Sequence, residues 1–136
     1  MANTLKLEIV TPEAKVFSGD IEMVSLSGVD GDMGIYPDHM PLMTQLVAGE
    51  VLVRQNGRDV ALAVGDGFVQ VTKDRVAILT DMAIKAEDID EAKAEEARKR
   101  AEERLAQKLS DEETATVQAA LVHATAQLKV KQRHKR

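Results

Sequence analysis

The sequence predicts an α+β protein, in which an N-terminal antiparallel β-sandwich or barrel is followed by a C-terminal antiparallel two-helix hairpin. Three observations support this fold class. Apolar and polar residues alternate through about the first 85 positions, two short turn sequences join alternating runs, and a segment rich in Ala, Glu, Lys and Arg begins near Glu87. We therefore place the sandwich at 1–87 and the hairpin at 88–136.

The predicted strands are short and separated by turn residues. Residues 5–9 alternate between apolar and polar side chains, so we expect a strand with one buried face. Further strands are expected at 14–17, 21–27 and 42–47. Strands that recur at intervals of roughly eight to twelve residues are typical of an antiparallel sandwich or barrel.

Two β-hairpins are predicted further along the chain. Asn56-Gly57 lies between the alternating runs 51–53 and 60–64, and both residues tolerate the positive φ that a two-residue hairpin turn requires. A second hairpin is expected around 72–75, between the runs 68–71 and 76–79.

The remaining chain predicts two helices. Residues 88–109 contain no Gly or Pro and only one β-branched residue, Ile89, which indicates a helix. Ser110, followed three positions later by Glu113, fits a capping box that begins a second helix at about 111–131. Two helices of equal length with a very short link form an antiparallel hairpin. The first should bury Ala94, Ala97, Ala101 and Leu105, and the second Ala115, Ala119, Val122 and Ala126.

The predicted helix–helix seam is made mainly of alanine. Alanine lets two helices approach closely but buries little apolar area, and burial stabilises by only about 25 cal/mol per Å². Isolated helices of this length are marginal in water. We therefore expect a hairpin that docks weakly on the sandwich and acts as a movable arm. The alternative is a solvated but static hairpin.

The composition limits the chemistry open to the chain. The 136 residues include no Cys and three His, which excludes disulfides, thiolate metal sites and Cys nucleophiles, and no two His have helical metal-ligand spacing. No hydrolase, P-loop, zinc or dinucleotide motif is present, and no strand-to-helix crossover follows the evenly spaced Gly28, Gly31 and Gly34. We predict a non-catalytic protein with no metal and no cofactor, whose function lies in contacts.

Charge and hydropathy bear on location and partners. The N-terminus lacks the pattern of a signal peptide, and no apolar run approaches the roughly 20 residues that span a bilayer, so we expect a soluble intracellular protein. Residues 1–87 hold 7 basic and 13 acidic residues, whereas 88–136 hold 11 and 10. The acidic first part and the scarcity of aromatic residues argue against nucleic-acid binding. The basic end, 129–136, is interpreted as a frayed, solvated helix end.

Residues 31–42, GDMGIYPDHMPL, contain two glycines and two prolines. Gly31 and Gly34 should allow conformations that a side chain forbids, while Pro37 and Pro41 should stiffen the segment and keep it out of a ladder. Charged side chains would then project from a rigid loop at one end of the sandwich. Such a loop suits docking because little ordering entropy is lost on binding. The predicted docking residues are Asp30, Gly31, Asp32, Gly34, Pro37, His39 and Pro41.

In its wider context this stretch reads VSLSGVDGDMGIYPDHMPLMTQL (24–46), which closely resembles the signature of the epsilon subunit of F-type ATP synthases. Three other segments resemble the same family in the same order: LEIVTPE (7–13), GDGFVQV (65–71) and DIDEAKAEEARKRAEERL (88–105). The resemblance thus covers nearly the whole chain. A sandwich adaptor unrelated to this family would require the match at 24–46 to be accidental.

The resemblance implies a non-catalytic central-stalk subunit of a rotary, proton-translocating ATP synthase. The sandwich would bind the gamma subunit and the c-ring, with the loop around His39 facing the ring; the alternative is that His39 only completes a turn. The hairpin would alternate between a docked state and an extended state that reaches the catalytic alpha and beta subunits and inhibits ATP hydrolysis. The subunit would lie at the cytoplasmic face of the bacterial inner membrane, peripheral to it; the alternative is the equivalent position in an organelle.

Positive charge along the first helix would meet acidic surfaces of the catalytic subunits. The residues concerned are Arg98, Lys99, Arg100, Arg104 and Lys108. Interleaved glutamates provide an alternative, because i,i+4 pairs such as Glu96–Arg100 would simply stabilise the helix.

Some members of the family bind ATP in the docked hairpin through a motif I/L-D-x-x-R-A and later arginines. The matching residues are Ile89, Asp90, Lys93 and Ala94, with Arg100 at a later position. Lys93 stands where the motif has arginine and lacks its two-pronged donor. On the second helix His123 and Gln127 stand where ATP binders have arginines.

We therefore expect weak or absent ATP binding, with Asp90 favoured instead as an N-terminal helix residue. The alternative function is an ATP-sensing module whose hairpin closes on the nucleotide. In that case millimolar ATP should raise the thermal stability of the chain.

Overall fold

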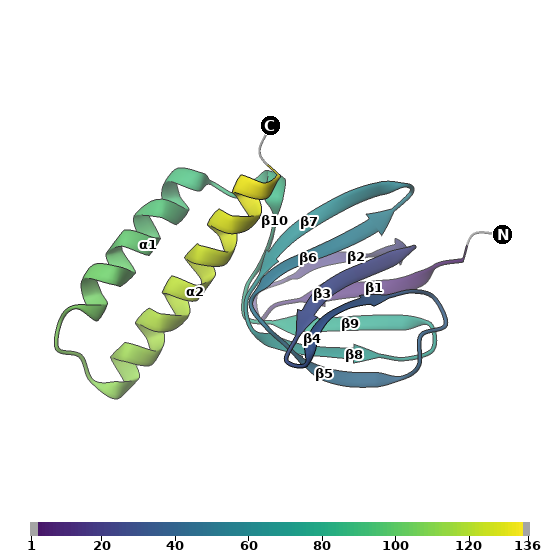
Figure 1. Cartoon of the computed structure of the whole chain (residues 1–136), viewed down its shortest axis with the longest axis horizontal. Coiled ribbons are helices and arrows are strands. Elements are labelled where there is room, and N and C mark those ends of the chain that lie inside the picture. Colours follow the sequence, from purple (N-terminus) through teal and green to yellow (C-terminus); the bar gives the residue numbers. More distant parts are fainter. Residues whose placement is uncertain (1–2, 135–136) are drawn as a thin grey trace.

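The computed structural model describes residues 3–134 of the chain. Within these residues ten strands curl into a sandwich, and two helices form a hairpin beside it (Figure 1). The second helix lies between the first helix and the strands. The predicted fold class, a β-sandwich followed by a two-helix hairpin, is confirmed. No helix of the described residues is long and apolar enough to cross a membrane.

The strands form one continuous, curled sheet in the order β10-β7-β6-β3-β5-β8-β9-β1-β2, with β4 paired to β3. Their bounds are β1 (Leu5–Val10), β2 (Lys15–Ile21), β3 (Met23–Gly28), β4 (Gly31–Ile35), β5 (Leu42–Leu46), β6 (Gly49–Gln55), β7 (Arg58–Val64), β8 (Gly67–Val71), β9 (Arg75–Thr80) and β10 (Ala83–Lys85).

Strand direction departs from the expectation at one pair. β1 and β9 run parallel, whereas the other pairs are antiparallel. The prediction of a wholly antiparallel sheet is therefore wrong here. The two strands are far apart in sequence, so no tight turn fixes their relative direction.

Both predicted hairpins are confirmed. Gln55 pairs with Arg58 across a turn in which Asn56 has φ 55° and Gly57 has φ 74°. These positive angles match the twist of the flanking strands. The Glu22 carboxylate fixes this turn to the β2–β3 corner, because it accepts hydrogen bonds from the backbone nitrogens of Asn56 (2.8 Å) and Gly57 (3.0 Å). The β8–β9 hairpin closes with Val71 opposite Val76.

One apolar core fills the sandwich. It contains seventeen buried side chains, and all except Phe17 are Leu, Ile or Val. Such a core agrees with the scarcity of aromatic residues in the sequence.

The helices differ from the expectation in length. A 3-10 turn, η1 (Ala86–Asp88), precedes α1 (Glu91–Leu105), and α2 spans Asp111–Arg133. The Asp90 side chain caps α1 by accepting a hydrogen bond from the Lys93 nitrogen at 3.1 Å, so the predicted start at 88 is wrong. The predicted capping box of Ser110 and Glu113 is confirmed. The helices have 15 and 23 residues, so the prediction of two helices of equal length is also wrong.

The second helix buries a different set of residues from the predicted stripe, and it does so on two faces. Ala126 and Val130 pack against Ala61 and Ala63 of β7 and against Ile89. Residues 124 and 128 lie on the other side of the helix, toward α1, and are also buried. Of the predicted stripe, Ala126 is buried whereas Ala115, Ala119 and Val122 are exposed. On α1, Ala94 and Ala101 are buried as predicted, and Ala97 and Leu105 are partly buried.

Candidate functional site

The predicted docking loop contains a strand. Residues 31–35 form β4, which pairs antiparallel with β3 through a two-residue turn at 29–30. Gly31 has φ 122°, as expected of a residue that needs glycine, but Gly34 is not among the positive-φ residues and pairs with Ser25 within the ladder. The expectation that this segment stays out of the sheet is therefore wrong for 31–35. It holds for Pro37 and Pro41, which lie outside the strands.

The strand separates the predicted docking residues into two groups. Asp30 lies in the turn before β4 and Asp32 near its start, whereas His39 lies in the loop after it. The strand alone spans roughly 13 Å at its usual rise. The acidic side chains and His39 therefore do not project from one end of the sandwich, as the sequence suggested.

Local hydrogen bonds occupy several of these groups. The Ser27 hydroxyl donates to Asp32 at 2.7 Å. The His39 nitrogen donates to the Tyr36 carbonyl at 3.2 Å, and Nδ1 of His39 lies 2.8 Å from the Met40 carbonyl. Asp38 has φ 66°, a conformation in which Asp is enriched and which the sequence analysis did not anticipate. His39 thus completes a turn, and its side chain is also partly accessible.

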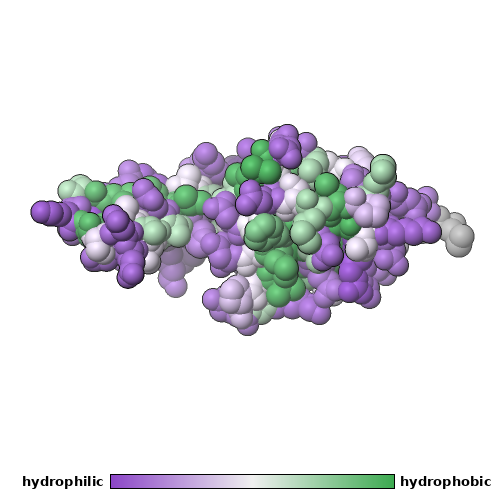
Figure 2. Space-filling view, turned by 90° about the horizontal axis from the view of Figure 1, so that it is seen from below, coloured by the Kyte–Doolittle hydropathy of each residue, from purple (hydrophilic) through white to green (hydrophobic). Residues whose placement is uncertain are grey.

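A second candidate surface is apolar and was missed by the sequence analysis. Large apolar side chains are more than half exposed on and beside the outer face of β5, β8 and β9: Met43 (67%), Phe68 (53%), Leu79 (52%), Val29 (57%), Tyr36 (58%) and Met40 (78%). Figure 2, which views the molecule from the side of these strands, shows hydrophobic side chains gathered on this face. We call it the apolar face.

The pairing of the strands places the exposed apolar side chains of β5, β8 and β9 on one face, with Gln45 and Gln70 between them. Phe68 lies opposite Leu79 on β9 and opposite Gln45 on β5, while Met43 lies opposite Gln70. The signal was present in the sequence, because FVQV and VAIL place apolar residues at both alternations of their strands. A patch of this kind on a folded protein marks an interaction site.

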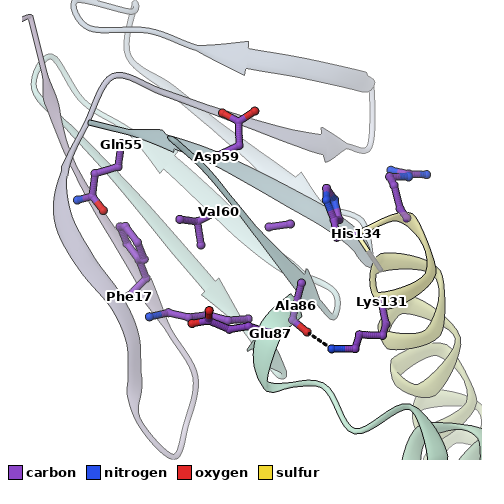
Figure 3. Close-up of a pocket in the computed structure, with 11 residues that line it drawn as sticks. Phe17, Gln55, Asp59, Val60, Ala86, Glu87, Lys131 and His134 are labelled. Atoms are coloured by element: carbon purple, nitrogen blue, oxygen red, sulfur yellow. Dashed lines mark hydrogen bonds between the residues drawn. The ribbon is translucent and has the colours of Figure 1, made fainter. Parts of the chain in front are cut away.

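The hairpin docks on β6 and β7, through the last turns of α2. Around the small apolar contact, Arg133 pairs with Glu50 at 2.7 Å and His134 pairs with the other oxygen of that carboxylate. Lys131 donates to the Ala86 carbonyl at 3.2 Å (Figure 3). The interpretation of this basic end as frayed and solvated is therefore wrong for 131–134. Residues 135 and 136 lie outside the described part of the chain.

Beside this contact lies an open cavity of about 620 Å³ (Figure 3). Its lining carries both charges: Lys85 and Lys131 are basic, Asp59 and Glu87 are acidic, and Phe17 adds an aromatic ring from the sandwich. None of the residues of the predicted nucleotide motif lines it.

The residues of the predicted nucleotide site have structural roles. Ile89 is 4% exposed and packs under α2, Ala94 is buried, and Asp90 caps α1. Lys93 is exposed. Arg100 lies in a separate groove between the helices and pairs with Glu96 at 2.9 Å. On α2, His123 pairs with Asp81 of the sandwich at 3.1 Å.

Glutamates engage three of the five predicted regulatory cations. Arg98 lies between Glu95 and Glu102, and its guanidinium lowers the pKa of Glu95 while that carboxylate raises the pKa of Arg98. Arg100 pairs with Glu96, and Arg104 lies 3.3 Å from Glu113 on α2. Lys99 and Lys108 are exposed. Among the described residues, no group of three or more His, Cys, Asp or Glu is arranged to hold a metal ion.

Comparison with known families gives matches to both parts of the chain. Residues 4–86 match the family described as "ATP synthase, Delta/Epsilon chain, beta-sandwich domain". Residues 87–132 match "ATP synthase, Delta/Epsilon chain, long alpha-helix domain".

Curated relatives named "ATP synthase epsilon chain" are similar over most of their length. The protein of Desulforamulus reducens is 42% identical, with 95% of this chain and 98% of the relative covered. That of Laribacter hongkongensis is 39% identical, with 93% and 92% covered. That of Pelotomaculum thermopropionicum is 46% identical, with 77% and 78% covered.

Solved structures resemble the chain in fold. A chain in the mitochondrial ATP synthase of Euglena gracilis (OSCP/F1/c-ring) superposes with a TM-score of 0.74 at 21% identity, with 93% of this chain and 80% of that chain covered. A chain in the central stalk/c-ring structure of the Tetrahymena thermophila enzyme gives 0.59 at 11% identity, with 91% and 96% covered.

Proposed function

The chain belongs to the ATP synthase delta/epsilon family, and we propose that it is a non-catalytic stalk subunit that couples c-ring rotation to the catalytic head and restrains ATP hydrolysis with its hairpin. The proposal rests on one observation: the sandwich and the hairpin differ in how they are packed and in which surface they expose. A rigid sandwich presents an apolar face on β5, β8 and β9 for docking, and a lightly packed hairpin lies against β6 and β7. The subunit would be peripheral, at the cytoplasmic face of the bacterial inner membrane.

The apolar face is the surface we assign to the gamma subunit. Exposed Phe68, Leu79 and Met43 lie on neighbouring strands, so docking them does not require the sandwich to change shape. Burial of large aromatic and Met side chains is typical of the centre of a stable protein interface. The two similar solved structures come from an F1/c-ring assembly and a central stalk/c-ring assembly, which supports a docking surface within the stalk.

The c-ring contact is assigned to the segment around β4. Asp30 and His39 are separated by β4, so this contact has two parts. The loop with Pro37, His39 and Pro41 also contains Tyr36 and Met40, which belong to the apolar face. That adjacency favours the His39 loop as the part that meets the ring together with gamma. Asp32 lines a groove facing α2 and is better placed to respond to the hairpin.

The inhibitory role rests on the small size of the docking contact. Five buried residues, three of them alanine, join α2 and Ile89 to β7. A contact of this kind is separated from the undocked state by only a few kcal/mol, about what a switch requires. Release would carry the outer helix, with Arg98, Lys99, Arg100, Arg104 and Lys108, toward acidic surfaces of the catalytic subunits.

Hydrolysis by a catalytic headpiece that lacks this subunit tests the proposal. The headpiece would be supplemented with the full chain or with a chain ending at Glu87. We expect both to bind and only the full chain to suppress hydrolysis. If both bind and neither suppresses, the subunit couples without inhibiting. If neither binds, the assignment to the stalk fails.

A Phe68→Ser variant tests the apolar face separately. We expect its affinity for a gamma-containing headpiece to fall by roughly tenfold or more, because large aromatic anchors dominate such interfaces. Lys73→Ser, in the exposed β8–β9 turn, is the matched control and should bind normally. Equal affinity of both variants would remove the apolar face from the gamma contact.

We retain the proposal that ATP binds weakly or not at all. Ile89, Ala94 and Asp90 already serve packing and capping, and Lys93 lacks the fork of arginine. Millimolar ATP should leave the thermal midpoint of the chain unchanged, and Lys93→Arg should raise the response if the motif is otherwise intact. A clear stabilisation of the parent chain by ATP would favour the sensing module instead.

A further inference from the structure

Two imidazole–carboxylate pairs join α2 to the sandwich. Nε2 of His123 lies 3.1 Å from Oδ1 of Asp81, and Nε2 of His134 contacts the Glu50 carboxylate. The two histidine side chains are 25% and 35% exposed, so each is partly withdrawn from water. Both histidines of the helical hairpin thus face an acidic group of the other domain.

The sandwich holds the backbone around Asp81 in position, while the Asp81 side chain is 52% exposed. The neighbouring Thr80 is only 6% exposed, and its hydroxyl donates a hydrogen bond to the Gly65 carbonyl at 2.9 Å. The Asp81 nitrogen donates to the Asp66 carbonyl at 3.3 Å. A side chain at Gly65 would collide with the pair, since an added Cβ would lie 2.0 Å from Oδ1 of Asp81 and 2.9 Å from Nε2 of His123. The absence of a side chain at 65 leaves room for this contact.

We propose that these two pairs form a proton-dependent latch, which holds the hairpin on the sandwich more firmly in mildly acidic than in alkaline solution. Imidazole in water changes charge near pH 6.5 or so, within the physiological range. Protonation makes each pair an ion pair, which favours the docked state. Deprotonation leaves at most a hydrogen bond from a neutral imidazole to the carboxylate, so the docked state loses stability as pH rises through neutrality.

Neighbouring charges make the two pairs unequal. Glu50 also binds Arg133, so a proton on His134 adds a second cation beside the same carboxylate, and Lys85, Lys131, Asp59 and Glu87 line the adjoining cavity.

At His123, by contrast, Asp81 is the direct partner. Asp66 lies in the adjacent turn with its carboxylate bonded to the Ala48 nitrogen, and α1 contributes alanines to the seam. The larger share of the pH response therefore belongs to His123.

The latch concerns the isolated chain, and only its effect on hydrolysis rests on the proposed function. Partly exposed ion pairs shift an equilibrium severalfold each. We expect the ratio of docked to undocked hairpin to be roughly fivefold higher at pH 5.5 than at pH 8.5.

Amide hydrogen exchange of the full chain measures this ratio, even when undocking is rare. Protection of α2 amides, corrected for intrinsic rates, would be compared at the two pH values, with sandwich amides as the folding check. In a His123→Gln/His134→Gln double variant the protection should no longer depend on pH. Asp81→Asn alone should remove most of the dependence. His39→Gln removes the third imidazole, away from the hairpin, and should keep the parent response.

Either of two results would overturn the latch: no pH response in the parent, or an unchanged response in the double variant. Because no ATP synthase is present in the experiment, its outcome is independent of the hydrolysis assay. A working latch in a subunit that fails to inhibit would leave the latch in place and remove the regulatory role.

Discussion

The two parts of this chain are packed in different ways. The sandwich encloses seventeen buried residues, nearly all of them Leu, Ile or Val, from most of its strands. The hairpin relies on five residues at its contact with the sandwich, and on Ala94, Ala101, Ala124 and Leu128 between its helices. Each large aliphatic side chain contributes about 1.5–3 kcal/mol on burial, and alanine contributes much less.

This difference separates a fixed platform from a part that is able to move. Strand pairing links distant parts of the sandwich, so local opening there breaks many contacts at once. The hairpin packs mainly through α2, with α1 on its outer side (Figure 1). Undocking it therefore leaves the sandwich core intact. The following predictions test whether the two parts really are independent.

The largest effect is expected in the sandwich core. Ile78 on β9 is fully buried, so Ile78→Ala should lower the free energy of unfolding by about 2–5 kcal/mol. Denaturant unfolding would measure the loss, and Ile78→Val should cost only about 0.5–1.5 kcal/mol. A small loss for the alanine variant would show that the sandwich is not the rigid part.

A charge at the docking contact should release the hairpin and spare the sandwich. Ala126→Asp places a carboxylate against the alanines of β7, which should cost about 2 kcal/mol or more of docking. Hydrogen exchange would show lost protection in α2 with unchanged sandwich amides. The control is Ala119→Asp, at an exposed position of the same helix. Joint loss of protection in both parts would mean that they unfold together.

Removing the helix cap should have a smaller, local effect. Ser110→Ala deletes the hydroxyl that accepts from the Glu113 nitrogen, at a cost of about 1 kcal/mol in hairpin stability. The first turn of α2 should exchange faster, while Ser18→Ala, on β2, should leave that turn unaffected. An equal loss across the sandwich would contradict the separation of the parts.

The smallest effect is a pH dependence confined to the sandwich. The backbone N–H groups of Gly57 and Asn56 lower the pKa of Glu22. The folded-state pKa is thus below the unfolded one, so Glu22 contributes stability above the unfolded pKa that is lost as pH falls through the folded value. Glu22→Gln should therefore be less stable than the parent at neutral pH and equal to it in strong acid. The free energy of unfolding of the parent and of Glu22→Gln would be measured as the pH is lowered. If the difference between the two stays constant, Glu22 does not have this role.

Local signals in the sequence were reliable where the structure depends on neighbours along the chain. Asn56-Gly57 forms the predicted turn because positive φ is a property of those two residues. Ser110 and Glu113 form the predicted capping box because their partners are three residues away. The resemblance carried by 24–46 led to the correct family for the same reason, since it rests on the residues themselves.

The candidate surfaces could be predicted only in part. The sequence placed Asp30 and His39 in one loop, but β4 separates them, since pairing with β3 extends up to Ile35 before Pro37 ends it. The apolar face was missed because exposed apolar residues resemble core residues until the sheet assigns each strand an inside and an outside.

The sequence by itself determined most of the strands, the two hairpin turns, the capping box and the presence of two helices, because these follow from backbone preferences and short-range hydrogen bonds. Only the tertiary structure decided which face of α2 is buried. Alanines occur around this helix, and their small side chains scarcely distinguish one face from another. One face of α2 is buried because it contacts Ala61 and Ala63 of the sheet and the Glu50 and Asp81 carboxylates. These residues are far from α2 in the sequence. Contacts between remote residues also decided the parallel pairing of β1 with β9.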